Sequence, residues 1–420
     1  MHVHPQTTTR VRAPGWSVLR KHAAWVIFIV SLAVLTAEAA GAPFEGDESD
    51  YIATSRYFGY LLRGELNRPE WAANHWTRTQ PPLTRYIIGS WLTLRGYDLE
   101  QLNQPYVSTA RSVDANRRRG RVPEDAVLHE ARVPMVVLAA VGIAAIASVA
   151  GALAGPLAAV TAGALALSSP IVRYTLVHAW AEAPLFCLMA VSLALASHPS
   201  CQRGAIGRSS LLGISLGAAS AVKLTGLVGL AATGAALLTD PLRTRAHAAL
   251  PGAAVAAAVV LVFGATFFLG VNPYLWPDPA GGFVGMLEER ATEMAEQQRQ
   301  WPEFAVTDPF TRPWLTVRGA LQFGPWADTP LAVPIGGVLV LAGGYAILRP
   351  GSSTTDDARH AGWMLAWWVA CYAIAITAGL GLSYPRYFMP LCLLLIPVAA
   401  IGAVKVVSAT VAVSRRPDPR

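Results

Sequence analysis

The chain has 420 residues, of which 53% are hydrophobic and 14% are charged. Soluble domains carry about 25% charged residues, so this composition excludes a soluble globular enzyme and a disordered protein. The net charge is +7, yet the chain has only three lysines, and most basic residues lie in short segments between apolar runs. That placement is typical of membrane topology signals and argues against nucleic acid as a partner.

Apolar runs long enough for membrane helices recur along the chain. The first, at residues 23–42, follows Arg20 and Lys21, so we expect a retained signal anchor with a cytoplasmic N-terminus. The further runs lie at 133–153, 156–173, 177–197, 209–238, 250–271, 331–348, 361–382 and 387–412.

The run at 209–238 is best explained as two short helices. Basic residues mark the loops at 198–208 and 239–249 as cytoplasmic, so the chain must cross the membrane an even number of times between them. A bend near residues 223–226 satisfies this and places Lys223 near the outer face; the alternative is one long tilted helix with one loop misassigned. The bend predicts an all-α polytopic bundle of about ten transmembrane helices in the plasma membrane, with both termini cytoplasmic.

Two long polar segments, 43–131 and 272–330, face outward in this topology, and residues 1–420 form a single domain. The apolar stretch from Leu83 to Leu94 is too short to span, so it predicts an interfacial helix in the first extracytoplasmic loop. The stretch from Gly282 to Trp301 is charged and amphipathic. It predicts a solvated helix face, or alternatively a cover over a site.

The first outer segment opens with an acidic cluster that includes Asp47 and Glu48. One interpretation is structural: Asp47 caps a helix, and its acidic neighbours favour the positive helix end. The other is catalytic, since a carboxylate at the membrane surface can act as a general base.

Three further ionisable residues lie in or beside apolar runs, where charge is costly and therefore points to function. Lys223 suits a phosphate as a point charge, with snorkelling to the interface as the alternative. Glu182 is either functional or a helix contact, with His178 as its partner. Arg386, between two tyrosines, is a second cation for an anionic headgroup or an interfacial anchor.

The cysteines and histidines give no metal signature. None of the four cysteines lies in a long polar segment, and neither CxxC nor HExxH spacing occurs. We therefore expect neither a disulfide framework nor a protein-built zinc site. No cofactor is required; a divalent metal is conceivable only if Asp47 and Glu182 converge.

Seven short motifs, taken in order, resemble the GT-C superfamily of membrane glycosyltransferases. Within it, the likeness is to the protein O-mannosyltransferase-like branch, which uses lipid-phosphate sugars. The motifs are Asp47-Glu48 after the first helix, Pro81-Pro82-Leu83, Ala131-Arg132-Val133-Pro134 at the second span, Glu182-Ala183-Pro184-Leu185, residues 219–226 around Lys223, residues 272–279, and Arg386-Tyr387-Phe388-Met389-Pro390.

The resemblance implies roles for individual residues. Asp47 matches the catalytic carboxylate and Glu48 its acidic neighbour, while Lys223 and Arg386 match positions that hold the donor phosphate. The implied substrate pocket includes Glu182, Tyr51, Pro82, Arg132, Tyr384 and Tyr387.

The resemblance also implies a reaction. A sugar, mannose favoured, passes with inversion from a polyprenyl-phosphate carrier to an acceptor hydroxyl at an extracytoplasmic active site. The acceptor is a protein, a glycan or a lipid. The second outer segment is too short for the sugar-binding-like domain of eukaryotic protein mannosyltransferases, which weakens the case for a protein acceptor. Membrane lipids are the remaining partners. The alternatives are a transporter or lipid flippase, and a non-catalytic membrane scaffold.

Overall fold

The computed structural model describes residues 15–73, 75–107, 112–198, 205–349 and 355–414. These residues are almost entirely helical, and the one β contact among them is an isolated bridge between Ala305 and Leu382. The apolar helices are α1 (Gly15–Gly41), α8 (Asp125–Ala154), α9 (Pro156–Ser168), α10 (Pro170–Val177), α11 (Glu182–Ala196), α12 (Ile206–Val222), α13 (Gly226–Arg243), α14 (Leu250–Gly270), α17 (Ala332–Leu348), α18 (Asp356–Gly379) and α19 (Pro385–Ser414).

Five of these helices are long and apolar enough to cross a membrane: α1, α8, α14, α18 and α19. The pair α9 and α10, bent by 75° at its break, would make a sixth, and α11, α12 and α17 are shorter apolar helices. The chain is therefore an all-α polytopic membrane protein, as its composition predicts. The figure of about ten crossings stays a prediction.

The bend predicted within residues 209–238 is confirmed. Helix α12 ends at Val222, Lys223 is extended (φ −156°, ψ 137°), and α13 begins at Gly226. A side chain at Gly226 would come within 2.3 Å of the backbone carbon of Ala219, so only glycine lets the chain reverse this tightly. The two helices pack against each other and against α14.

One end of the bundle is closed by a buried histidine. His360 Nδ1 lies 2.9 Å from a carboxylate oxygen of Asp240, and its Nε2 lies 3.0 Å from the carbonyl oxygen of Ala196. These contacts join the end of α11, the last turn of α13 and the start of α18. These three helix ends therefore lie on one face of the bundle, as the loop charges predict.

Glycines let neighbouring helices approach closely. A Cβ added to Gly217 of α12 would lie 2.4 Å from the carbonyl oxygen of Gly264 in α14. The main core runs through α8, α11, α12, α18 and α19, where Trp368 and Tyr372 are among the largest fully buried side chains. Such close backbone contact is how small residues hold membrane helices together.

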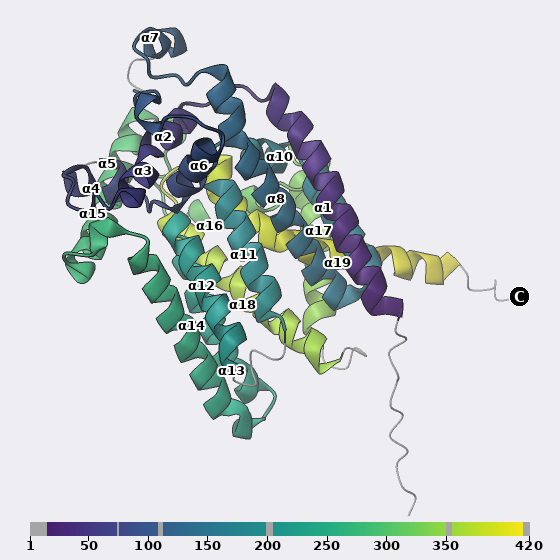
Figure 1. Cartoon of the computed structure of the whole chain (residues 1–420). Coiled ribbons are helices and arrows are strands. Elements are labelled where there is room, and N and C mark those ends of the chain that lie inside the picture. The colour runs from purple at the N-terminus through teal and green to yellow at the C-terminus, as the bar shows by residue number, and fades with distance from the viewer. Residues whose placement is uncertain (1–14, 74, 108–111, 199–204, 350–354, 415–420) are drawn as a thin grey trace, which may run out of the picture.

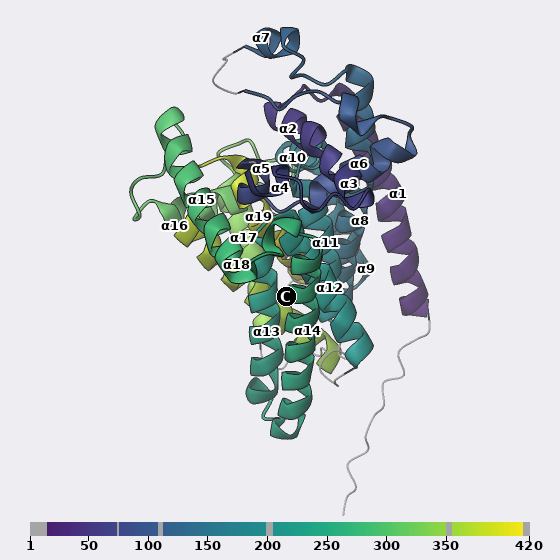
Figure 2. The same ribbon diagram turned by 60° about the vertical axis from the view of Figure 1, so that its left-hand side comes forward.

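The polar helices gather at the opposite end of the bundle (Figures 1 and 2). They are α2 (Gly46–Thr54), α3 (Arg56–Leu62), α4 (Glu70–Ala73), α5 (His75–Thr79), α6 (Leu83–Leu94), α7 (Val113–Arg118), α15 (Pro279–Gln300) and α16 (Arg312–Ala320), with short 3₁₀ turns at Leu99–Gln101 and Pro273–Leu275. A third 3₁₀ turn, His247–Ala249, connects α13 to α14. Apart from that connecting turn, all of these elements belong to the two long polar segments of the sequence. Helix α6 has the bounds that the apolar stretch predicts.

Candidate active site

A cavity of about 1470 Å³ lies where the polar helices meet the bundle. Its walls come from α2, the start of α11, the break between α12 and α13, and the start of α19, with α15 and the end of α18 completing them. Asp47, Lys223 and Arg386 all line it, although they are separated by up to 339 residues in sequence. Of the remaining expected residues, the cavity is also lined by Glu182, Tyr51, Tyr384 and Tyr387.

Asp47 forms an ion pair with Arg386 in this cavity. Asp47 sits in the first turn of α2, and Arg386 is the second residue of α19. The Asp47 side chain remains 48% exposed, so a second group can still reach it. The expectation that Asp47 caps the helix is wrong, because the N-cap residue is Glu45 and the Glu48 side chain accepts the Glu45 N–H at 3.1 Å.

Lys223 forms the second ion pair of the cavity. Its Nζ lies 3.0 Å from an Oε of Glu182, which is only 6% exposed. The helix break carries this lysine out of the regular backbone pattern and turns it toward the start of α11. His178 is not the partner of Glu182, because its ring contacts the carbonyl oxygens of Tyr174 and Pro43.

Aromatic rings surround both cations. The Arg386 guanidinium lies 5.5 Å from the ring centre of Trp180 and 5.8 Å from those of Tyr384 and Tyr387. Lys223 Nζ lies 5.6 Å from the ring centre of Tyr387. Rings within about 6 Å stabilise a cation without neutralising it, so the carboxylates of Asp47 and Glu182 are the groups that balance these two charges.

Glu48 and Arg132 form a fully buried pair outside the cavity. Two Glu48–Arg132 hydrogen bonds measure 2.8 and 2.7 Å, and the two side chains are 0% and 2% exposed. Arg132 also donates to the carbonyl oxygens of Ala39, Ala42 and Pro43, and Glu48 accepts the N–H of Ala179. The pair thus connects α1, α2, α8 and the segment that precedes α11. Because both side chains are buried, neither can contact a substrate.

Pro82 does not line the cavity either. It is the buried N-cap residue of α6, while its neighbour Pro81 faces the cavity. Of the expected site residues, the structure therefore places Glu48, Pro82 and Arg132 outside the cavity lining.

The cavity also contains two polar residues that were not foreseen, Asp50 and Arg85. Asp50 lies three residues after Asp47 and the expected Tyr51 lies four residues after it, which places all three on one face of α2. Asp50 accepts the N–H of Tyr106 at 2.7 Å, and burial together with the charge of Asp47 raises the pKa of its carboxyl to about 8. Arg85, on α6, is 1% exposed and also lines the cavity. The helical spacing is a signal that points to Asp50; nothing in the sequence points to Arg85.

Helix α15 covers one side of the cavity. Arg290 and Glu293 pair with each other and line the cavity, and Arg78 of α5 binds Glu289 at 2.8 Å. His75 lies 3.7 Å from Glu293 and 3.8 Å from Glu289, and the Glu293 carboxylate is the main group that raises the pKa of His75. Of the two interpretations of this amphipathic stretch, the cover is the one that the geometry matches.

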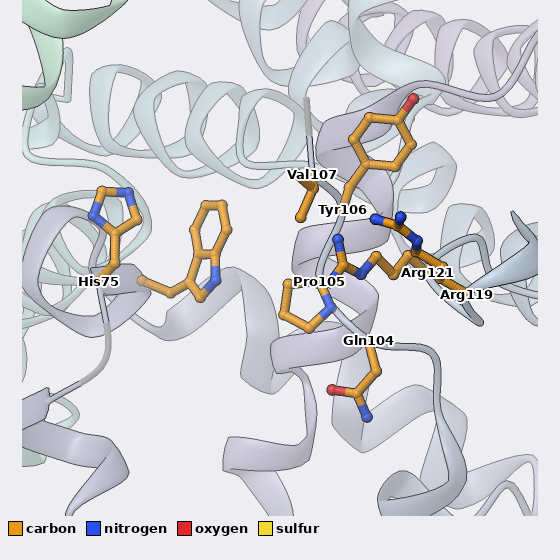
Figure 3. A pocket seen from close by; sticks show the side chains of 8 residues that line it. His75, Gln104, Pro105, Tyr106, Val107, Arg119 and Arg121 are labelled. Atoms are coloured by element: carbon orange, nitrogen blue, oxygen red, sulfur yellow. The ribbon is translucent and has the colours of Figure 1, made fainter. Parts of the chain in front are cut away.

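A second, smaller cavity of about 720 Å³ adjoins the first through His75, Trp76 and Tyr106. Figure 3 shows His75 on one side and Tyr106, Arg119 and Arg121 on the other. Across the described residues, no cluster of three or more His, Cys, Asp or Glu side chains is arranged to hold a metal ion. Asp47 and Glu182 share the main cavity, and each is bound to a cationic side chain.

The sequence matches no protein-family model and no curated protein sequence. Solved structures match in fold. Crystal structures of ArnT from Cupriavidus metallidurans, bound to undecaprenyl phosphate and in the apo state, both align with a TM-score of 0.51 at 16% and 18% identity. These alignments cover 96% and 95% of this chain and 64% and 63% of ArnT.

A third neighbour is the archaeal oligosaccharyltransferase AglB from Archaeoglobus fulgidus, in complex with an inhibitory peptide and a dolichol-phosphate. It aligns with a TM-score of 0.55 at 10% identity, over 96% of this chain and 53% of AglB. The chain therefore spans less than two thirds of the length of these neighbours. At these identities the likeness concerns the fold alone, and the chain has the fold that ArnT and AglB share.

Proposed function

We propose that the protein transfers a sugar from a polyprenyl-phosphate carrier to an acceptor hydroxyl, with inversion, at the extracytoplasmic face of the membrane. The observation that carries this proposal is one cavity lined by a partly exposed carboxylate, Asp47, and two cations, Lys223 and Arg386. The fold neighbours support the donor class, since ArnT was crystallised with undecaprenyl phosphate and AglB was solved with dolichol-phosphate. Mannose is the favoured sugar, and the acceptor is a protein, a glycan or a lipid.

The cavity offers separate surfaces to the two ends of such a donor. Lys223 and Arg386 would bind the phosphate, one as a point charge and the other through its planar fork. An apolar wall adjoins Lys223 and would contact the first isoprene units. It is formed by Leu224, Val228, Ala375 and Ile376.

Asp47 would act as the general base. It accepts the proton of the acceptor hydroxyl while that oxygen bonds to the anomeric carbon and the bond from this carbon to the phosphate oxygen breaks. The negative charge gained by the departing lipid phosphate would be stabilised by Lys223 and Arg386. Preorganised contacts of this kind contribute about 3–4 kcal/mol each to lowering a barrier.

The two ion pairs link donor binding to this chemistry. A phosphate that draws Arg386 toward itself weakens the hold of Arg386 on Asp47. The Asp47 carboxylate is then free to accept a hydrogen bond from the acceptor hydroxyl. In this way the bound donor would itself prepare the base.

The proposal is tested by mass spectrometry of glycans and glycoproteins from a strain that lacks the protein. We expect one glycosylated species to disappear, to return with the wild-type gene, and to stay absent with Asp47→Asn. Asp114→Asn is the matched control, because it makes the same chemical change at an exposed position outside both cavities. Restoration by Asp47→Asn would remove the assigned base, and an unchanged glycan profile in the deletion strain would favour a transporter.

A further inference from the structure

The arginine-bearing wall of the smaller cavity is held in place by hydrogen bonds to a buried asparagine and to α2. Asn116 is 0% exposed, and its side chain binds both the N–H and the carbonyl oxygen of Val107 at 3.1 Å. The N–H of Gln104 donates to the carbonyl oxygen of Gly120 at 2.9 Å. Ser49 of α2 donates to the carbonyl oxygen of Arg121 at 2.5 Å. The wall is thereby attached to the helix that carries Asp47.

This cavity combines positive charge with ring surfaces. Arg119 and Arg121 take part in no ion pair among the described residues. Trp76 and Tyr106 line the same cavity and supply its aromatic rings. His75 is held by Glu289 and Glu293, so it contributes a ring more than a free charge.

Arg85 continues this cationic path into the main cavity. Its guanidinium donates to the carbonyl oxygens of Trp76 at 3.0 Å and Gln80 at 3.1 Å, but its buried Nε finds no partner in the described part of the chain. It forms no ion pair there, although it is 1% exposed. Asp50 does not supply the missing charge at neutral pH, since the pKa of its carboxyl is raised to about 8.

A buried guanidinium without a counter-charge is costly, and a bound anion relieves that cost. The position of Arg85 suits anion binding near the proposed base. Its guanidinium lies 5.8 Å from the ring centre of Tyr51, which is on the same face of α2 as Asp47. An anion bound at Arg85 would therefore sit close to the proposed base.

We propose that the smaller cavity and Arg85 form the acceptor site, and that the acceptor is an acidic glycan. Arginine forks bind carboxylates in pairs of hydrogen bonds, and aromatic faces accept the apolar face of a sugar ring. The glycan enters past Arg119 and Arg121, passes Trp76 and Tyr106, and places a carboxylate on Arg85. The donor lies on the other side of the cavity, at Lys223 and its apolar wall. This inference rests on the proposed function and names its acceptor class.

The test uses the full-length protein in phosphatidylcholine nanodiscs. Fluorescein-labelled oligogalacturonate is the probe, a neutral malto-oligosaccharide of equal length is its control, and fluorescence anisotropy is the readout. We expect the acidic chain to bind at least about tenfold more tightly, as a single charge-assisted hydrogen bond would allow. Equal affinity for both chains would overturn the inference, and so would tighter binding of a polyglutamate of the same charge.

Two pairs of substitutions locate the binding. Arg119→Gln with Arg121→Gln should weaken oligogalacturonate binding several-fold and reduce its salt dependence. Arg117→Gln with Arg118→Gln removes the same charge from the same exposed segment but outside both cavities, and should leave binding unchanged. Equal losses in the two pairs would show a diffuse surface effect and contradict the site.

Arg85→Gln should weaken binding about tenfold or more. Arg85→Lys, which keeps the charge and loses the planar fork, should give an intermediate loss even if the glutamine variant does not fold. Binding of undecaprenyl phosphate to the same nanodiscs separates the two proposals. If wild-type protein binds this lipid and ignores oligogalacturonate, the acceptor inference alone fails; if it ignores the lipid, the proposed donor class fails.

Discussion

At the scale of single residues, charge at the site is arranged in pairs with different purposes. Glu48 and Arg132 are buried and fully hydrogen-bonded, whereas Asp47 with Arg386 and Lys223 with Glu182 face a cavity. Breaking a buried pair leaves an uncompensated charge and is strongly destabilising. Breaking a cavity-facing pair changes what the cavity binds.

Glu48→Gln should therefore lower the free energy of unfolding strongly and the turnover rate of the folded protein only weakly. It leaves the Arg132 guanidinium buried without a full counter-charge, at a cost of about 3–5 kcal/mol. We expect a lower melting temperature in detergent, with turnover per folded molecule reduced far less than by Asp47→Asn. A native melting temperature combined with lost turnover would return Glu48 to the catalytic pair.

Substitutions at Lys223 and Glu182 should have opposite effects on donor affinity. Lys223→Gln removes a charge-assisted bond of about 1.5–3 kcal/mol, so undecaprenyl phosphate should bind about 10- to 100-fold more weakly. Glu182→Gln releases the lysine from its 3.0 Å partner and should tighten binding. Native mass spectrometry gives both affinities, with Lys405→Gln, an exposed lysine far along α19, as the control. A shift of the same sign in both variants would argue against a phosphate at Lys223.

Asp50 should make stability depend on pH. Its carboxyl keeps a proton up to about pH 8 in the folded protein, against an ordinary value of 3.8. The folded state then binds more protons than the unfolded state in this window, so the free energy of unfolding falls as pH rises. The slope is at most about 1.4 kcal/mol per pH unit.

Asp50→Asn retains an acceptor for the N–H of Tyr106 and cannot ionise. Its melting temperature should fall less than that of the wild type between about pH 4 and pH 8. Parallel melting curves for the two proteins would show that Asp50 does not hold its proton.

Single residues were predictable where a charge stands out from an apolar background. Lys223 and Glu182 interrupt long apolar runs, and Arg386 opens one, so their cost in a membrane singles them out. Glu48 and Asp47 cannot be told apart in the sequence, because they are adjacent acidic residues. Tertiary packing decides that Glu48 is buried and that Asp47 faces the cavity. Arg85 is hidden for the opposite reason: it lies in a polar segment, where an arginine is ordinary.

At the scale of helices, the break between α12 and α13 matters most to the site. It ends one helix at Val222, presents Lys223, and starts the next at Gly226. The loop charges predict this break, because two loops on the same side of the membrane require an even number of crossings between them. The same reasoning misses the 75° bend between α9 and α10, since a proline after Ser169 does not reveal its angle.

Gly226→Ala should damage this break. The added Cβ would lie 2.3 Å from the backbone of Ala219, so α12 and α13 must separate. We expect a lower melting temperature and weaker binding of undecaprenyl phosphate. Gly234→Ala in the same helix meets nothing within 4 Å and should be neutral or stabilising by about 0.5–1 kcal/mol. Identical behaviour of the two variants would contradict the tight reversal.

At the scale of the whole molecule, the fold separates two ends. One is closed by the Asp240–His360 contact, and the other holds the polar helices and both cavities. Apolar runs predict the all-α bundle well, because lipid imposes length and composition on each span. The outward orientation of the two long polar segments stays a prediction. The closing of α15 over the cavity was one of two open alternatives, since an amphipathic helix does not specify what its inner face meets.

Sugar transfer in the large cavity, as we propose it, would split a lipid-phosphate sugar into two products. The most direct test of this transfer incubates the purified protein with polyprenyl-phosphate [¹⁴C]mannose and a membrane extract. Two products are measured: the label that appears in the acceptor, and the polyprenyl phosphate that is released. Wild-type protein should produce both in equal amounts, and Asp47→Asn should produce neither although it still binds the lipid. Equal turnover by the two proteins, or movement of intact donor across the bilayer without cleavage, would contradict the proposed transfer.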